Sequence, residues 1–367
     1  MGIRLDGTTD TISAPGSDLN LGQSGDSVKV ASQVQLPTHG ALSNRNLVIN
    51  GSMIVAQRGT SQTSVANNSN ENFQTLDRFG FQFGNNAGGA CTISQSTEVP
   101  SNEGFTQSYK VDVTTADTSL ADDHMIYVHQ GLEAQDVRNS GWDYTSTSSY
   151  VTVSFWVKSS KAGNYCFTMR AQDVGHFYYN HTFTLVANTW KKVTHSIPGH
   201  ASLVINNDSG LGIDLRWQLA IAANRNDATT GSWQSGSENT STDIVNFFDS
   251  TSNDFYLTGV QLEVGEKATP FEHRSYGDEL ARCQRYYQEA GTILTTSSPD
   301  RYFVNVTLPV EMRDSPAISA GSIESGSGGS LLALYSRAGA NTSKTHFYQG
   351  SDNSLITNAW FIFDDEL

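Results

Sequence analysis

Short segments in which apolar and polar residues alternate make up most of this chain, and this pattern constrains its fold more than any other feature. The segment YVTVSFWVKS at 150–159 is one example, because every second residue of an extended backbone lies on the same side, and here these are Val151, Val153, Phe155 and Val157. RFGFQFG at 78–84 repeats the pattern with phenylalanines. Many such segments, separated by Gly, Asn, Asp and Ser, predict an antiparallel jelly-roll β-sandwich over residues 46–275.

The start of this sandwich is marked by NLVINGSMIVAQRG at 46–59. We expect two strands here, joined by a turn at Asn50 and Gly51, because Asn-Gly tolerates the positive φ that tight turns require. Arg58 would then face Asp77 of the segment TLDRFGF, and we expect these two residues to form a structural ion pair.

Composition excludes several classes of function. The formal net charge is −15, so the chain would repel a polyphosphate, and we expect no nucleic-acid partner. No run of 18 apolar residues occurs, so we expect no membrane insertion, and MGIRLDGTTD does not match a secretory signal. The three cysteines, Cys91, Cys166 and Cys283, have no metal-site spacing, which predicts reduced or buried thiols.

Residues 1–45 contain very short alternating segments such as DSVKVASQVQL. One copy has too few apolar side chains for a core of its own, so we expect an oligomeric stalk in which several chains share one core. A disordered tail is the alternative, but regular alternation favours the stalk.

The pattern changes at 276–291, where SYGDELARCQRYYQEAG predicts the one strong helix, with Ser275 as its cap and Gly291 as its end. Leu280, Cys283 and Tyr287 share one face of this helix. Two interpretations remain open: a linker packed on its own sandwich, or a place where subunits meet, which makes these three residues oligomer-interface candidates. Residues 292–367 return to strands and predict a small C-terminal β domain.

No motif in the chain predicts catalysis: GxSxG, HExxH and Walker A patterns do not occur, and we expect no enzyme activity. Binding is the better interpretation, since sugars are recognised by flat aromatic rings combined with planar amides. The segments FYYN, LRWQ and GSWQ supply such pairs, and the glycan-binding candidates are Tyr178, Tyr179, Asn180, Trp217, Trp233 and Gln234.

Several of these segments together resemble a module of tailed-bacteriophage virion proteins, usually described as tail fibres or host-adhesion proteins. They are NRNLVINGSMIVAQRGTS, TLDRFGF, LTGVQLEVGEKATPFEHRSYGDELARCQRYY, LPVEMRDSP and the closing FDDEL, which together span 44–367. The module is in turn similar to jelly-roll carbohydrate-binding modules, whose opening pattern is matched by Asn46, Leu47, Asn50 and Gly51.

The resemblance implies a homotrimeric structural protein of the virion, made in the host cytoplasm. Residues 1–45 would attach it to other virion proteins, and the sandwich would contact host cell-surface glycans. A tail fibre is the first hypothesis, a capsid decoration or head fibre with an architectural role is the second, and a depolymerase tailspike is the third. We expect no cofactor; calcium is the one ion that the resemblance leaves open, and Gln261 and Glu263 stand where such modules often carry a calcium-ligating Asp.

A shared core predicts a measurable mass. Light scattering of the purified chain should give about three times 39.8 kDa. A chain that scatters as a monomer would contradict the trimer.

Overall fold

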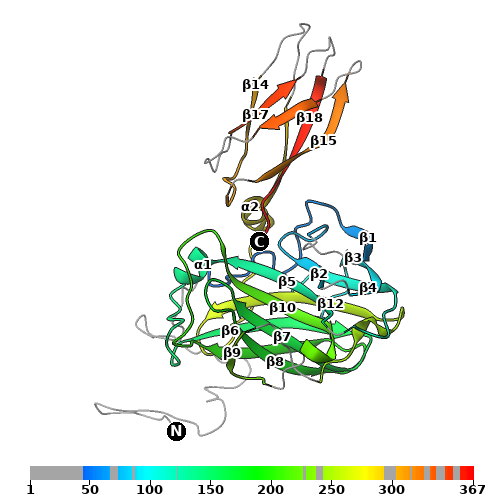
Figure 1. Ribbon diagram of the computed structural model, residues 1–367, viewed down its shortest axis with the longest axis vertical. Helices are drawn as coiled ribbons and strands as arrows, with labels where there is room; N and C mark the ends of the chain where they lie inside the picture. Colours follow the sequence, from blue (N-terminus) through cyan, green and yellow to red (C-terminus); the bar gives the residue numbers. More distant parts are fainter. Residues whose placement is uncertain are drawn as a thin grey trace, which may run out of the picture. The chain divides into compact units, whose positions relative to one another are not determined.

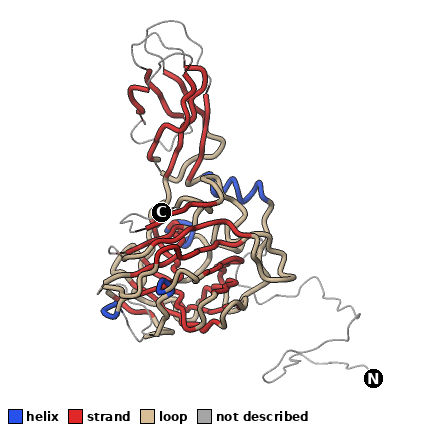
Figure 2. The backbone as a smooth tube through the Cα atoms, turned by 90° about the vertical axis from the view of Figure 1, so that its right-hand side faces the viewer, coloured by secondary structure: helices blue, strands red, loops and turns tan. Residues whose placement is uncertain are grey.

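The computed structural model describes residues 44–66, 73–84, 87–121, 123–225, 229–236, 243–292, 303–314, 316–325, 331–335, 344–349 and 356–367. The predicted stalk at 1–45 therefore lies almost wholly outside the described residues. Strands dominate the described chain (Figures 1 and 2), and every ladder between named strands is antiparallel. The mainly β fold class is confirmed.

Two six-stranded sheets form the sandwich. Sheet A has the order β1 (Ser61–Ala66), β3 (Ala90–Ser96), β4 (Ser108–Thr115), β12 (Asp254–Val264), β6 (Tyr150–Ser159) and β9 (Lys191–Pro198). Sheet B has the order β11 (Trp233–Ser235), β8 (Phe177–Leu185), β7 (Gly163–Ala171), β10 (Leu211–Ile221), β5 (Met125–Glu133) and β2 (Gly80–Gly84). Short helical turns occur at α1 (Ala134–Arg138), η1 (Ala223–Arg225) and η2 (Phe247–Asp249).

The core lies between these sheets and follows the predicted alternation. Val151, Val153, Phe155 and Val157 of β6 are all fully buried. The ring of Trp217 contacts the rings of Phe155 at 5.7 Å and Phe167 at 5.5 Å between centroids. The described cysteines Cys91, Cys166 and Cys283 are buried and form no disulfide bond, and Cys283 lies in the helix described below.

Residues 46–59 do not form the two expected strands. Asn50 does adopt a positive φ of 60°, but its side chain holds an irregular turn instead of a hairpin. Its Nδ2 donates to the carbonyls of Val55 at 2.8 Å and Asp77 at 2.9 Å. Asn46 Oδ1 accepts from the backbone N–H of Val48 and Leu262, both at 3.0 Å. Amide side chains here replace the ladder bonds that a strand would have made.

Helix α2 (Tyr276–Gln284) begins where the sequence predicted, because the hydroxyl of Ser275 accepts from Asp278 N–H at 3.2 Å. The predicted end at Gly291 is wrong. Residues 287–292 form strand β13 (Tyr287–Thr292), which pairs with β18 (Ile356–Asp364) near the end of the chain. The sequence pattern keeps helical spacing past Gln284, but the ladder with β18, whose paired residues lie 67 to 77 positions further along the chain, determines the backbone there.

The three interface candidates on this segment contact their own chain. Cys283 is fully buried beside Ile49, Val55 and Tyr286, and Leu280 packs against the same cluster. Tyr287 is 4% exposed, and its ring lies 3.8 Å from the guanidinium carbon of Arg58. Of the two interpretations left open, the structure supports a helix packed on its own sandwich, with Cys283 and Tyr287 buried and Leu280 partly exposed.

The C-terminal strands form two three-stranded sheets. One has the order β13, β18 and β15 (Ala317–Ser325), and the other β14 (Phe303–Thr307), β17 (Lys344–Gln349) and β16 (Leu331–Tyr335). They lie together in Figure 1, above helix α2 in that view. The small C-terminal β domain of the prediction is built from these strands.

A buried charge cluster ties the last residues of the chain to the sandwich. The expected pair of Arg58 and Asp77 is confirmed at 4.0 Å, but Arg58 lies closer to Asp364 and Glu366, each at 3.1 Å. Arg78, only 1% exposed, pairs with Glu366 and donates to the Gly131 carbonyl at 2.6 Å. Burial alone would raise the pKa of Glu366, but the two guanidinium groups hold this pKa below its usual value.

Removing Arg78 should therefore destabilise the protein strongly. Arg78→Met leaves the Glu366 carboxylate buried without its main partner, which costs about 3–5 kcal/mol of unfolding free energy. Lys161→Met is the matched control, because the pair of Lys161 and Asp249 is 25% and 38% exposed, and its loss costs about 1 kcal/mol or less. Urea unfolding measures both variants, and equal losses would contradict a structural role for the buried pair.

Candidate functional site

The outer face of sheet B is polar, and most of the polar side chains on it are nevertheless buried. In β10 the residues Leu215, Trp217 and Leu219 face the core, so the alternate residues face outward. The same alternation in β5, β7 and β8 sets further polar residues on that side. We call this set the polar face: Tyr127, His129, Thr168, Tyr178, Asn180, Thr182, Asp214, Arg216 and Gln218.

Strand register brings these side chains into rows. Arg216 lies directly across from His129 of β5 on one side and from Thr168 of β7 on the other. Thr168 in turn lies across from Asn180 of β8, and its hydroxyl donates to Asn180 Oδ1 at 2.9 Å. Gln218 pairs with Tyr127 in the next row. Directly opposed side chains in a sheet lie about 5 Å apart, so His129, Arg216, Thr168 and Asn180 form a continuous line of polar groups.

An ion pair stands at the centre of the polar face. Arg216 Nε donates to Asp214 Oδ2 at 2.5 Å, and the guanidinium carbon lies 4.3 Å from the centroid of the Tyr127 ring. The other carboxylate oxygen of Asp214 is 3.6 Å from His129 Nδ1. Burial alone would raise the pKa of Asp214, but Arg216 and His129 hold this pKa at about 2. Asp214 is therefore a fixed negative charge at neutral pH.

Several polar atoms of this face have no hydrogen-bond partner in the part of the chain that the structure describes. They are His129 Nε2, Thr182 Oγ1, Asp214 Oδ1 and Gln218 Oε1. A buried polar atom left unpaired costs about 1–3 kcal/mol, so native proteins keep few of them. Four on one face, from three strands, indicate a place where a ligand with many donors and acceptors would complete the hydrogen bonding.

The predicted glycan-binding residues divide by strand alternation. Tyr178 and Asn180 belong to the polar face, and Gln234 of β11 lies across from Tyr178, with its amide donating to Ser232 Oγ at 3.0 Å. The expectation that Tyr179, Trp217 and Trp233 are available to a sugar is wrong, because they lie in the core.

Each of these three rings is buried, and Trp233 also has a hydrogen-bond partner. Trp217 is 1% exposed, Tyr179 is 3% exposed, and Trp233 is 8% exposed with its indole donating to the Pro198 carbonyl at 2.7 Å. The Ser and Gly residues around Trp233 predict an exposed loop. That segment is instead an edge strand, and Trp233 faces the core of the sandwich.

The residues that sequence reasoning missed are His129, Asp214, Arg216 and Gln218. A signal was present in IDLRWQLAI at 213–221, where a strand of apolar residues carries Asp, Arg and Gln at every second position. An amphipathic strand normally exposes such residues to water, so the sequence alone does not distinguish an ordinary solvent face from one whose polar groups are buried.

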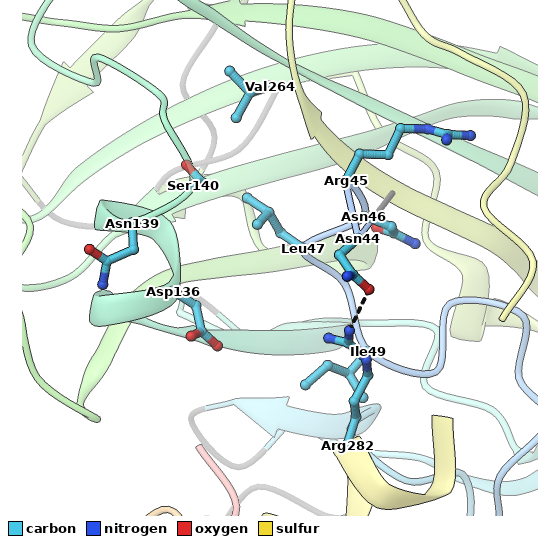
Figure 3. A pocket seen from close by; sticks show the side chains of 10 residues that line it. All are labelled: Asn44, Arg45, Asn46, Leu47, Ile49, Asp136, Asn139, Ser140, Val264 and Arg282. Atoms are coloured by element: carbon cyan, nitrogen blue, oxygen red, sulfur yellow. Dashed lines mark hydrogen bonds between the residues drawn. The ribbon is translucent and has the colours of Figure 1, made fainter. Parts of the chain in front are cut away.

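A hollow, shown in Figure 3, lies where the described chain begins. It has a volume of about 550 Å³ and lies between residues 44–49, Asp136 and Asn139 of the α1 region, and Arg282 of α2. Arg282 donates to Asn44 Oδ1 at 2.9 Å, and Arg45 donates to Thr269 Oγ1 at 2.7 Å. Because these charged groups already hold the fold together, this pocket is a weaker candidate than the polar face.

Glu263 stands where the resemblance to carbohydrate-binding modules left a calcium ligand open. Its oxygens accept from Thr269 N–H at 2.8 Å and from the Thr269 hydroxyl at 2.6 Å, and Arg45 lies 3.6 Å away. Within the described ranges, no group of three or more His, Cys, Asp or Glu side chains could hold a metal ion.

In those same ranges, no helix is long and apolar enough to cross a membrane.

Comparison with known proteins finds matches only among solved structures. No family model matches the chain, and no curated protein matches it. Among solved structures, the chain is similar to one titled "CBM4 structure and function", with 13% identity, a TM-score of 0.31, and coverage of 59% of this chain and 97% of that one. It is also similar to a family 11 carbohydrate-binding module from Clostridium thermocellum (12% identity, TM-score 0.27, 57% and 99% covered). A third is the CBM22-1 xylan-binding domain from Paenibacillus barcinonensis (14% identity, TM-score 0.26, 56% and 99% covered).

The charge of Asp214 predicts a pH dependence. Its pKa in the folded state, about 2, lies below the ordinary 3.8, so the stability it contributes is present above pH 4 and is lost as the pH falls toward 2. The difference in unfolding free energy between wild type and Asp214→Asn should shrink by on the order of 2 kcal/mol between pH 6 and pH 2. Urea unfolding at several pH values measures this difference, and a difference independent of pH would contradict the assigned ion pair.

Proposed function

We propose that this chain is a non-catalytic glycan-binding protein and that the polar face of sheet B is its sugar-binding surface. The observation that supports this most is the set of buried polar atoms on His129, Thr182, Asp214 and Gln218 that have no hydrogen-bond partner among the described residues. Sugar hydroxyls both donate and accept hydrogen bonds, so one pyranose ring can satisfy several such atoms at once.

The chemistry of the face suits a neutral or polar sugar. The planar guanidinium of Arg216 and the amides of Asn180 and Gln218 present donors and acceptors in fixed planes, which fits pairs of adjacent hydroxyls. Tyr127 adds a flat ring beside Arg216. Planar polar groups around an aromatic ring are the usual composition of sites that bind small polar ligands.

A binding role fits the carboxylate content of this surface better than hydrolysis does. Glycosidases use two carboxyl groups, one of which must carry a proton at working pH. Asp214 is the carboxylate of the polar face among its described residues, and Arg216 and His129 keep it ionised. An ionised carboxylate already paired with arginine is a poor general acid.

The resemblance of the sequence to phage tail proteins extends this proposal. We place the chain in a homotrimeric tail fibre, attached to the virion through residues 1–45 and contacting host glycans with three copies of the polar face. Weak single sites would then bind a cell surface together, because linked sites raise the effective concentration of one another. A capsid decoration protein is the alternative, and immunogold labelling of virions distinguishes the two locations.

A glycan array tests the binding surface. Gln218→Leu keeps the size of the side chain but removes the amide, so we expect at least a tenfold loss of affinity, equal to about 1.4 kcal/mol. Gln62→Leu on β1 of sheet A makes the same chemical change at an exposed amide and should bind as wild type does. If Gln218→Leu binds every glycan as tightly as the wild type does, or if the wild type binds no glycan, the proposal is contradicted.

A further inference from the structure

The outer face of sheet A carries a groove that is lined by aromatic side chains and lies on the side of the sandwich opposite the polar face. Its volume is about 450 Å³, and its lining includes Trp156 of β6, Phe105, Phe271 and His273. Trp156 points outward because its neighbours Phe155 and Val157 face the core, and it is only partly buried. Lys192 and Glu103 stand at the groove as a donor and an acceptor.

The floor of this groove depends on a glycine. Gly259 sits at a bulge between β12 and β6, with a φ of +62°. A Cβ at this position would lie 2.6 Å from Phe105 Cζ and 3.1 Å from Trp156 Cδ1, so any larger residue would push both rings away. Glycine therefore allows two aromatic rings to meet the backbone of the sheet at one point.

The wall beside Trp156 is packed firmly. The ring centroids of Phe105, Phe271 and His273 lie 4.9–5.3 Å from one another. Rings that contact one another in this way hold their orientation without a ligand, so the groove needs little ordering when a ligand binds.

The aromatic surface continues beyond the groove. Tyr256 and Lys158 are cross-strand partners one row away from Thr258 and Trp156, which places the rows about 7 Å apart. The rings of Tyr256 and Trp190 lie 6.2 Å apart, and both are partly exposed. Trp190 donates its indole N–H to Glu98 at 3.3 Å, and Lys158 pairs with the same carboxylate at 2.8 Å.

We infer that this groove is a second carbohydrate-binding site, which takes a neutral oligosaccharide. One pyranose ring stacks on Trp156 with its hydroxyls toward Lys192 and Glu103, and the next units extend toward Tyr256 and Trp190. Flat rings on neighbouring rows of the sheet, with polar groups at the rim, match the alternating apolar faces and hydroxyl edges of a hexopyranose chain. This site stands on different strands from the polar face and does not depend on it.

Isothermal titration with cellohexaose, xylohexaose and maltohexaose tests this site in the Gln218→Leu background, where the polar face is disabled. We expect one of these probes to bind with about one site per chain. Adding Trp156→Ala should lower the affinity at least tenfold, whereas Trp156→Phe should recover part of it, since a smaller ring still stacks.

The controls separate binding from folding and from the first proposal. Equal urea midpoints for the two Trp156 variants exclude a folding defect as the cause. Binding that is lost in Gln218→Leu but present in wild type, or binding that Trp156→Ala leaves unchanged, would overturn the second site while leaving the polar face standing. Failure of all three probes to bind the wild-type chain and the Gln218→Leu variant would also overturn it.

Discussion

The buried pair of Arg78 and Glu366 is the contact on which the described architecture depends. Two charges removed from water are tolerated only when each has its partners, so the segments that supply them must all be in place together. Arg78 follows the irregular turn built by Asn50 and Asp77, and its guanidinium lies 3.4 Å above the Tyr286 ring. Glu366 arrives from the far end of the chain. The cluster therefore connects the opening turn, the helix α2 region and the C-terminal strand β18.

The same cluster brings together segments that lie far apart in the sequence. QRG, TLDRFGF, RCQRYY and FDDEL supply Arg58, Asp77, Arg78, Tyr286 and Glu366, which meet in one buried cluster. These residues hold the fold and do not face a ligand. The surfaces proposed for binding lie elsewhere, on the outer faces of the two sheets, where strand alternation sets side chains that the core does not use.

Much of the fold could be predicted from local pattern. Alternation located β6, the Ser275 cap located the start of α2, and charge complementarity located the pair of Arg58 and Asp77. The end of α2 could not be predicted, because the ladder between β13 and β18 joins residues far apart in the sequence. The sequence predicted the positive φ of Asn50 but not the hydrogen bond that its side chain makes with Asp77.

The candidate sites were harder to predict, because assigning a strand does not say which of its side chains face the core and which face outward. Moving by one residue along β8 exchanges Tyr178 of the polar face for Tyr179 of the core. The sequence placed Trp156 in a strand correctly. It could not show that residues of 102–105 and 268–273 lie around this side chain and form a groove with it. Composition could suggest sugar binding, whereas register across four strands was needed to say which residues form the polar face.

A crystal structure with a bound glycan tests the central claim most directly. The ligand with the highest affinity for the wild-type chain should lie on the polar face, with its hydroxyls within hydrogen-bond distance of Asp214, Arg216 and Gln218. If the ligand with the highest affinity binds elsewhere on the chain and leaves the polar face unoccupied, the account is contradicted.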